Sequence, residues 1–263
     1  METQLTYYGH ASFKLVTLRG NVLLIDPWLT NPLFEKGKAE LDALKRVDLI
    51  LLTHGHFDHV GDSVDIAKRT GAKLVATFDL SAAMKAVHGY PAEQSDMDTT
   101  GHFGGELRLL DGDVTVEFVP AWHGSAVMKE GSSPYYGGTP SGLIIAIADG
   151  PTIYDTGDTD LFSDMALVSR YHAIDVMIVC MGDHFTMGPR RAADAVQLVD
   201  PRVVIPQHFA TFPVLTGTPD MFQRELKKRE SKAELRVMKV GETIPLPPAR
   251  SRISDEPIGK PIA

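Results

Sequence analysis

The chain has few of the features that mark exported, membrane-spanning or disulfide-stabilised proteins. It contains one cysteine among 263 residues, so no disulfide can form within it. This residue, Cys180, lies in an apolar stretch, where a buried and unreactive thiol is expected. No basic segment followed by an apolar one stands at the N-terminus, and the apolar runs are far too short to cross a bilayer. We therefore expect a cytoplasmic protein with no membrane partner.

Positive charge is also scarce. The chain has 26 Lys and Arg against 34 Asp and Glu, which gives a formal net charge of −8. Because proteins that bind nucleic acids neutralise phosphates with Lys and Arg, this balance disfavours a nucleic-acid partner. We expect a small-molecule substrate instead. The sequence is compatible with a homo-oligomer and does not fix the oligomeric state.

Length and composition are those of one large globular domain. Hydrophobic residues make up 43% of the chain and charged residues 23%, and no repeats interrupt it. From Pro245 onward the sequence is rich in proline and in residues that break regular structure. We expect a hydrolase domain over residues 1–244. Residues 245–263 should form an extended tail, either loosely tethered or laid along the domain or a neighbouring subunit.

The apolar pattern is typical of a layered α/β protein, in which helices cover a central sheet. Three strands open the chain, and helices and strands then alternate. Residues 91–105 read as a loop. Strands are predicted at residues 4–8, 13–17, 22–25, 73–77, 107–110, 114–119, 152–154, 174–180 and 203–205. Helices are predicted at residues 63–69, 80–87, 189–199 and from 219 to about 230.

The most informative segment follows the apolar stretch 47–52 and reads Thr-His-Gly-His-Phe-Asp-His over residues 53–59. Imidazole nitrogens and carboxylate oxygens are the ligands that zinc, manganese and iron accept. Residues two apart in an extended chain point the same way, so His54 and His56 can hold one ion together. After a turn, Asp58 and His59 can hold a second ion roughly 3.5–4 Å away. A polar surface turn is the less favoured alternative, because it would not require three histidines beside an aspartate.

Further potential ligands follow the strands of the second half. Strand-like runs precede His123, Asp158, the pair Asp183-His184, and His208. Side chains at strand ends are held more firmly than side chains on free loops, as two ions at a fixed separation require. These residues are therefore expected to share one cleft.

Taken together, these motifs resemble the metallo-β-lactamase superfamily. The resemblance rests on His-x-His-x-Asp-His at 54–59, Ala-Trp-His-Gly-Ser around His123, Asp-Thr-Gly-Asp ending at Asp158, and Pro-Gln-His ending at His208. Tyr-Gly-His-Ala-Ser-Phe, Leu-Ile-Asp-Pro-Trp and Met-Gly-Asp-His-Phe-Thr-Met-Gly-Pro resemble its uncharacterised metal-dependent hydrolase branch, which is related to the ascorbate-phosphate lactonase group.

The resemblance implies a four-layer αββα sandwich that holds two divalent metal ions, zinc most favoured and manganese next. It places His54, His56 and His123 on one ion, places Asp58, His59 and His208 on the other, and makes Asp158 the bridge. A metal-bridging hydroxide would be the nucleophile, because metal binding lowers the pKa of water from 15.7 to about 7. The catalytic residues would be Asp58, Asp158 and His184.

Other polar residues are less certain members of the site. Asp26 is expected either to accept the second N–H of a ligand histidine or to stabilise a turn before Pro27. His10 and His184 either line the cleft or lie outside it. Asp155 precedes Asp158 in the same motif but falls within the predicted strand.

Several residues are not assigned to the predicted centre. Arg190 and Arg191 stand at a helix start, where a solvated pair is favoured over an anion site. The loop 124–140, with Met128, Tyr135 and Tyr136, either covers the cleft or packs on the body. The remaining histidines are expected outside the site, namely His88, His102 and His172.

The predicted function is hydrolysis of an ester-like bond, in a lactone, a carboxylic ester or a phosphate ester. A nuclease or phosphodiesterase of the same fold is disfavoured by the net charge. A di-iron redox protein is disfavoured because no flavin-binding domain is attached. A non-catalytic metal-binding protein is disfavoured because all seven ligand positions are intact.

Overall fold

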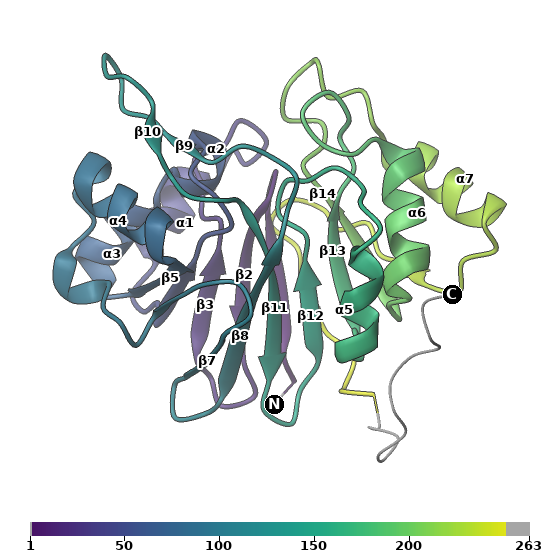
Figure 1. The fold of residues 1–263 in the computed structure, drawn as a ribbon, viewed down its shortest axis with the longest axis horizontal. Helices are drawn as coiled ribbons and strands as arrows, with labels where there is room; N and C mark the ends of the chain where they lie inside the picture. The colour runs from purple at the N-terminus through teal and green to yellow at the C-terminus, as the bar shows by residue number, and fades with distance from the viewer. Residues whose placement is uncertain (1, 251–263) are drawn as a thin grey trace.

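The computed structural model, which describes residues 2–250, has two seven-stranded sheets packed face to face with helices on both outer sides (Figure 1). This arrangement is the four-layer αββα sandwich expected from the sequence, and the prediction is confirmed. The small helices α1, α3 and α4 cover the first sheet, and α5, α6 and α7 cover the second (Figure 1). Among the described residues, no helix is long and apolar enough to cross a membrane.

The first sheet is built from the N-terminal part of the chain and one late strand. Its strands β1, β2 and β3 are antiparallel neighbours, whereas β3, β4, β5 and β6 run parallel. The late strand β16 pairs with β1 at the edge. The order is β16 (Thr243–Pro245), β1 (Gln4–Gly9), β2 (Ser12–Val16), β3 (Val22–Ile25), β4 (Leu49–Leu51), β5 (Lys73–Thr77) and β6 (Thr100–Gly101).

The second sheet repeats this design, with antiparallel strands on one side and parallel strands on the other. Its order is β15 (Glu234–Leu235), β14 (Val203–Gln207), β13 (Val176–Cys180), β12 (Thr152–Asp155), β11 (Ser141–Ile147), β8 (Val114–Pro120) and β7 (Glu106–Leu109). A separate hairpin, β9 (Ala126–Val127) with β10 (Tyr135–Tyr136), projects from the body (Figure 1).

The helices begin and end where the sequence provides caps. The Thr218 side chain accepts from Met221 N at the start of α7. Helix α6 begins with Pro189 and is followed by the C-cap residue Asp200, whose φ is 50°. The helices are α1 (Gly37–Ala43), α2 (Phe57–Val60), α3 (Ser63–Thr70), α4 (Phe78–Ala83), α5 (Met165–Tyr171), α6 (Pro189–Val199) and α7 (Pro219–Lys228).

Three apolar clusters form the core, one between the sheets and one between each sheet and its helices. On β3, Leu23 and Ile25 pack between the sheets, whereas Leu24 packs toward the helices. On β13, Val176 packs between the sheets, whereas Met177 packs toward the helices. Because both faces of such strands are buried, their sequences are continuously apolar. This double packing holds the strand ends that carry the predicted ligands.

Several predicted boundaries were wrong. Helix α4 begins at Phe78 because the Thr77 hydroxyl accepts from Leu80 N, and the chain continues as a π-helical turn, Met84–His88. The predicted loop 91–105 contains a short 3₁₀ helix, Ala92–Gln94, and β6, which pairs with β5. Sequence reasoning did not assign β11 or α5.

The first residues of the predicted tail lie along the domain. Leu246 is buried, its N–H donates to Thr3 O, and Arg250 N donates to Asp175 Oδ1 at 2.9 Å. Residues 251–263 lie outside the described part of the chain. The division at residue 244 remains a prediction.

Candidate metal centre

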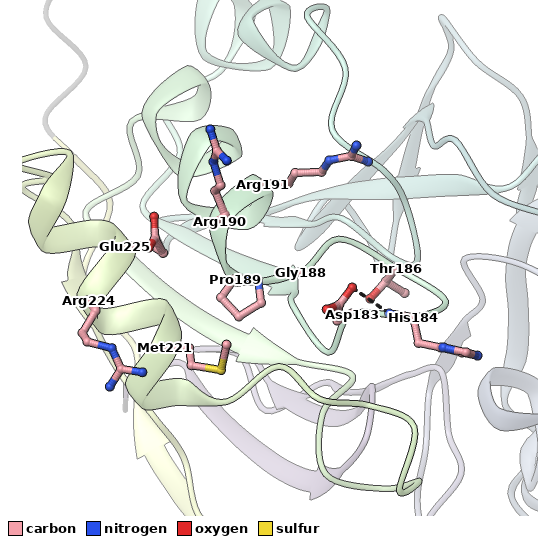
Figure 2. A pocket seen from close by; sticks show the side chains of 10 residues that line it. All are labelled: Asp183, His184, Thr186, Gly188, Pro189, Arg190, Arg191, Met221, Arg224 and Glu225. Carbon is pink, nitrogen blue, oxygen red and sulfur yellow. Dashed lines mark hydrogen bonds between the residues drawn. The ribbon is translucent and has the colours of Figure 1, made fainter.

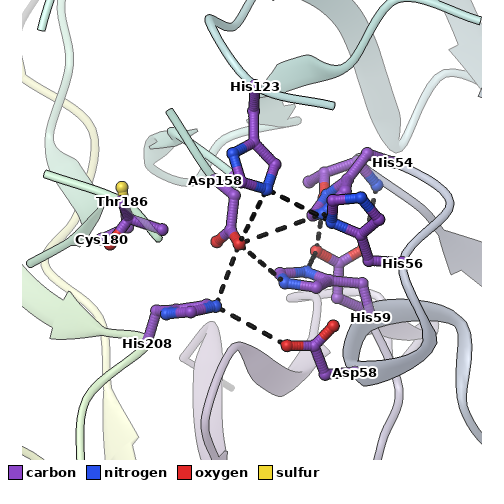
Figure 3. Close-up of polar contacts among 12 residues, drawn as sticks. His54, His56, Asp58, His59, His123, Asp158, Cys180, Thr186 and His208 are labelled. Atoms are coloured by element: carbon purple, nitrogen blue, oxygen red, sulfur yellow. Dashed lines mark hydrogen bonds and ion pairs between the residues drawn. The ribbon is translucent and has the colours of Figure 1, made fainter. Parts of the chain in front are cut away.

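The loops after four strands, together with helix α2, bring all seven predicted ligands together (Figure 3). His54 to His59 follow β4, and the other three ligands follow β8, β12 and β14. Gly182, after β13, faces the last of these loops: a Cβ there would lie 1.8 Å from His208 O. Only glycine fits that approach.

The first group of potential ligands consists of His54, His56 and His123. His56 Nδ1 lies 3.0 Å from His54 Nε2 and 3.2 Å from His123 Nε2. Two nitrogens bound to the same tetrahedral zinc, each about 2.0–2.1 Å from it, would lie roughly 3.3 Å apart. The three nitrogens therefore have the spacing that one cation requires.

Hydrogen-bond chemistry shows which atom His54 presents to this group. Thr53 Oγ1 donates its proton to Asp26 Oδ2 at 2.6 Å, so it must accept from His54 Nδ1, 3.0 Å away. Burial, followed by the neighbouring His59, lowers the pKa of His54 well below its ordinary value. His54 is therefore neutral, and its Nε2 lone pair points at His56.

The second group contains Asp58, His59 and His208, together with His10. Their potential ligand atoms all lie within 4.8 Å of one another. His208 Nε2 is 3.7 Å from Asp58 Oδ2, and His10 Nε2 donates to the same oxygen at 3.0 Å. The side chains of His10, His59 and His208 are buried, and that of Asp58 is 12% exposed.

Asp158 lies between the two groups, as a bridging ligand would. Its Oδ2 is 2.9 Å from His208 Nε2 and 3.3 Å from His59 Nε2. The same oxygen is 3.6 Å from His123 Nε2 and 4.0 Å from His54 Nε2 (Figure 3). Burial opposes ionisation, but His208 and His59 hold the pKa of Asp158 well below its usual range. The carboxylate is therefore charged.

Besides His208 Nδ1, two buried atoms in this centre lack a hydrogen-bond partner among the described residues, His59 Nε2 and Asp158 Oδ1. A buried polar atom without a partner costs about 1–3 kcal/mol. Divalent cations between the two groups would coordinate such atoms. The donor set and its spacing therefore fit two cations, although their number and identity remain predictions.

Asp26 supports a histidine from each group. Its Oδ2 accepts from His59 Nδ1 at 2.6 Å and, through Thr53, is connected to His54. Histidine ligands commonly donate their second ring N–H to a carboxylate, which fixes the ring. Of the two alternatives predicted for Asp26, this geometry favours the histidine acceptor. The residue has a left-handed backbone, with φ at 42°.

Some predicted members lie elsewhere. His184 is exposed, lies outside the potential ligand groups, and lines a pocket with Asp183, Arg190 and Arg224 (Figure 2). Its catalytic role remains a prediction.

Arg191 binds both oxygens of Asp160 at 2.7 Å. The guanidinium groups of this pocket point in different directions (Figure 2), as in a solvated cluster rather than an anion site.

The remaining polar candidates have structural surroundings. Asp155 Oδ1 accepts from Gly157 N and Gln207 Nε2, and burial raises the pKa of Asp155 to about 7. Burial raises the pKa of the Cys180 thiol to about 12, in agreement with an unreactive cysteine. Among the described residues, the potential ligand groups do not include His88, His102 or His172.

Sequence reasoning missed an aromatic cluster beside the second group, which we call the aromatic wall: Trp28, Phe57 and Phe212. The ring of Trp28 lies 5.7 Å from that of Phe57 and 6.2 Å from that of Phe212, between centroids. Trp28 and Phe57 were visible within the motifs, but nothing in the sequence joins them to Phe212. In the loop 124–140, Val127 is buried whereas Tyr135 and Tyr136 are exposed.

Comparison with known proteins agrees with this architecture. Residues 21–209 match the model of a family described as the Beta-lactamase superfamily domain. The solved structure of Igni18, described as a novel metallo hydrolase from the hyperthermophilic archaeon Ignicoccus hospitalis, is similar with a TM-score of 0.79 and 33% identity. The similarity covers 93% of this chain and 98% of that one.

The sequence is also similar to that of named hydrolases. A UPF0173 metal-dependent hydrolase of Thermodesulfovibrio yellowstonii is 54% identical over 244 residues, which cover 92% of this chain and 91% of the relative. A UPF0173 metal-dependent hydrolase of Pyrobaculum arsenaticum is 42% identical over 243 residues, covering 92% and 100%. The chain therefore belongs to the Beta-lactamase superfamily and, within it, to the UPF0173 metal-dependent hydrolases. It is a metal-dependent hydrolytic enzyme.

Proposed function

We propose that the enzyme hydrolyses an ester-like bond in a small molecule and uses two divalent cations, zinc most favoured and manganese next. The bond is that of a lactone, a carboxylic ester or a phosphate ester. The observation that carries the proposal is the position of Asp158 Oδ2, within 4.0 Å of histidines from both groups. A single shared carboxylate reduces the repulsion between two neighbouring cations.

The protein side chains would hold the cations and keep their own protons in place. When bound, the cations would acidify a water molecule and polarise the substrate oxygen under attack. His54, His56 and His123 would hold the first cation, and Asp58, His59 and His208 the second. Asp26 keeps the Nε2 atom of His59 directed at Asp158 by accepting from its Nδ1. No serine or cysteine nucleophile is required.

The surroundings of the centre favour a substrate with an apolar part. Phe57 directly precedes Asp58 and is 55% exposed, and Trp122 directly precedes His123 and is 68% exposed. Large exposed aromatic side chains beside a catalytic centre offer apolar contact area to a substrate. We therefore favour an aryl or alkyl ester, or a lactone with an apolar substituent. The cytoplasmic location and a homo-oligomeric state remain predictions.

The test is a substrate panel on protein of defined metal content. The protein is stripped with a chelator, reloaded with zinc or manganese, and assayed with lactones, aryl esters and phosphodiesters. We expect hydrolysis of lactones or esters that needs about two cations per chain and rises with the apolar area of the substrate. His102→Ala, which changes an exposed histidine, is the matched control. Preference for phosphodiesters would support the phosphodiesterase alternative, and turnover by the stripped protein would refute the mechanism.

A further inference from the structure

His10 contacts two predicted ligands of the second cation, Asp58 and His208, although it lies 48 or more residues from both in the sequence. It is fully buried in the turn between β1 and β2, and its φ is 56°. We propose that His10 is a positioning residue, which holds Asp58 and His208 in the orientation that lets both bind one cation. This inference rests on the proposed function, because it assumes a cation at the second group.

The side chain of His10 fixes Asp58. Its Nε2 lies 3.0 Å from Asp58 Oδ2, and an ionised carboxylate only accepts, so Nε2 donates. The other ring nitrogen, Nδ1, lies 2.7 Å from Thr211 Oγ1, whose hydroxyl can also donate to Phe209 O at 3.3 Å. In the neutral imidazole, Nδ1 carries no proton and accepts from this hydroxyl. Thr211 thereby selects the tautomer that keeps the N–H directed at Asp58. One oxygen of Asp58 is anchored, and the carboxylate cannot rotate away from a bound cation.

The same residue supports His208 in two ways. His10 O accepts from His208 N at 2.8 Å, and the two rings pack with centroids 4.1 Å apart. This support matters because His208 Nδ1 is buried and has no hydrogen-bond partner among the described residues. His59, in contrast, is fixed by Asp26. The orientation of the His208 ring therefore depends on the contact of Nε2 with Asp158 and on packing, to which the His10 ring contributes.

A second role for His10 must be distinguished, because its ring nitrogen also lies within reach of a cation at the second group. If His10 were itself a ligand, Nε2 would have to lose its proton and Asp58 would lose this hydrogen bond. Glutamine separates the two roles. A glutamine amide can donate a hydrogen bond to Asp58, as the imidazole does, but it has no imidazole lone pair for a cation.

The experiment measures zinc affinity rather than turnover alone. Wild type, His10→Ala, His10→Gln and Thr211→Val are stripped and titrated with zinc against a chromophoric chelator, with His102→Ala as the matched histidine control. We expect His10→Ala to weaken one of the two zinc ions by roughly 10–100-fold and to leave the other unchanged. His10→Gln should restore most of this loss. Thr211→Val should give a smaller loss at the same ion, and the control none.

Three results would overturn the inference. The first is His10→Ala binding both zinc ions as tightly as wild type. The second is an equal loss at both ions in protein that is folded by circular dichroism, which would indicate a general structural role. The third is His10→Gln binding as weakly as His10→Ala, which would indicate a ligand. If His10→Ala does not fold, Thr211→Val decides, because unchanged zinc affinity in this variant would contradict the proposal.

A different result would concern the proposed function itself. Wild type that binds fewer than two zinc ions contradicts the two-cation centre, and with it any role for His10 at the second one. Wild type that binds two zinc ions but hydrolyses no ester or lactone contradicts the proposed reaction and leaves the role of His10 intact.

Discussion

The two histidine groups share Asp158 but lie in opposite electrostatic surroundings. Burial lowers the pKa of His54, His56 and His123, so the first group is neutral. In the second group, burial is outweighed by Asp158, which raises the pKa of His59 well above its ordinary value and that of His208 to about 9. The first group therefore presents lone pairs that are ready for a cation. The second must release protons first.

The groups also differ in access to solvent. His56 and His123 are only partly buried, whereas His59 and His208 are buried and the Asp58 side chain is 12% exposed. The first group lies at the open side of the centre, beside the exposed Trp122. The first group is therefore the more accessible and neutral half of the centre, and the second is the more buried half, in which cation binding is coupled to proton release.

The largest effect is expected when Asp158, the residue that the two groups share, is removed. Asp158→Ala should weaken the binding of both cations and lower kcat/KM by roughly 10³-fold or more, since bound cations contribute several kcal/mol to transition-state charge stabilisation. Elemental analysis and steady-state kinetics on the same preparation measure this. If only one cation were lost, Asp158 would belong to a single group and the shared-carboxylate interpretation would be wrong.

The next effect tests the electrostatic contrast through pH. His208 is protonated in the metal-free protein below pH about 9, so each proton that zinc displaces weakens the apparent affinity about tenfold per pH unit below that value. Affinity at the second group should rise from pH 7 to 9, while affinity at the first group changes little. Chelator competition at several pH values measures both. An equal dependence of zinc affinity on pH at the two groups would contradict the electrostatic difference between them.

The same shift affects the stability of the metal-free fold. Because the pKa of folded His208 is raised above the unfolded value near 6.5, its contribution is fully present below pH 6.5 and is lost as the pH rises through about 9. Thermal unfolding of the stripped protein should therefore occur at lower temperature as the pH rises over this range.

Asp26→Asn sharpens the comparison because Asp26 contacts both halves. The substitution keeps the size of the side chain but removes its charge. We expect both cations to weaken by roughly 10–100-fold, whereas His10→Ala affects only one. Asp62→Asn, which alters a partly buried aspartate that accepts from Thr30, is the matched control. If only the second group, which contains His59, lost cation affinity, the hydrogen bonds from Asp26 through Thr53 to His54 would not stabilise the first group.

The smallest effect concerns the substrate. Phe57→Ala removes part of the aromatic wall beside the second group and should raise KM for apolar esters by roughly 3–10-fold, the equivalent of one aromatic contact. Acetate esters, with little apolar area, should be nearly unaffected, and kcat should change little. An equal rise for every substrate would indicate that Phe57 supports Asp58 rather than the substrate.

Much of this architecture could be predicted from the sequence, because strand-forming runs and metal-ligand motifs are local. The spacing of His54, His56, Asp58 and His59 predicted their clustering correctly, although their roles as ligands remain predictions. The link from Asp26 through Thr53 to His54 could not be read, because it depends on how the ends of β3 and β4 lie side by side. For the same reason, the contact of His10 with Asp58 was not predicted.

His184 shows the opposite case, in which a local motif suggested a residue of the site but the fold leaves the side chain exposed. It lies in a motif between a strand and a helix, as an active-site residue often does. The backbone turns sharply there, with φ of 69° at Asp183 and 61° at His184, and the side chain is exposed. Such a turn depends on tertiary packing rather than on residue type. Phe212 is a similar case, since only the packing of its loop brings it to Trp28.

The left-handed backbones at His10, Asp26 and His208 bear on how this enzyme can be engineered. For residues other than glycine, each such conformation costs about 1–2 kcal/mol, so the fold sacrifices some of its resistance to heat at the very places that organise its chemistry. Attempts to make the protein more thermostable by relaxing these turns would therefore select for inactive molecules. Stabilising changes are better sought among the exposed helices on the outer layers.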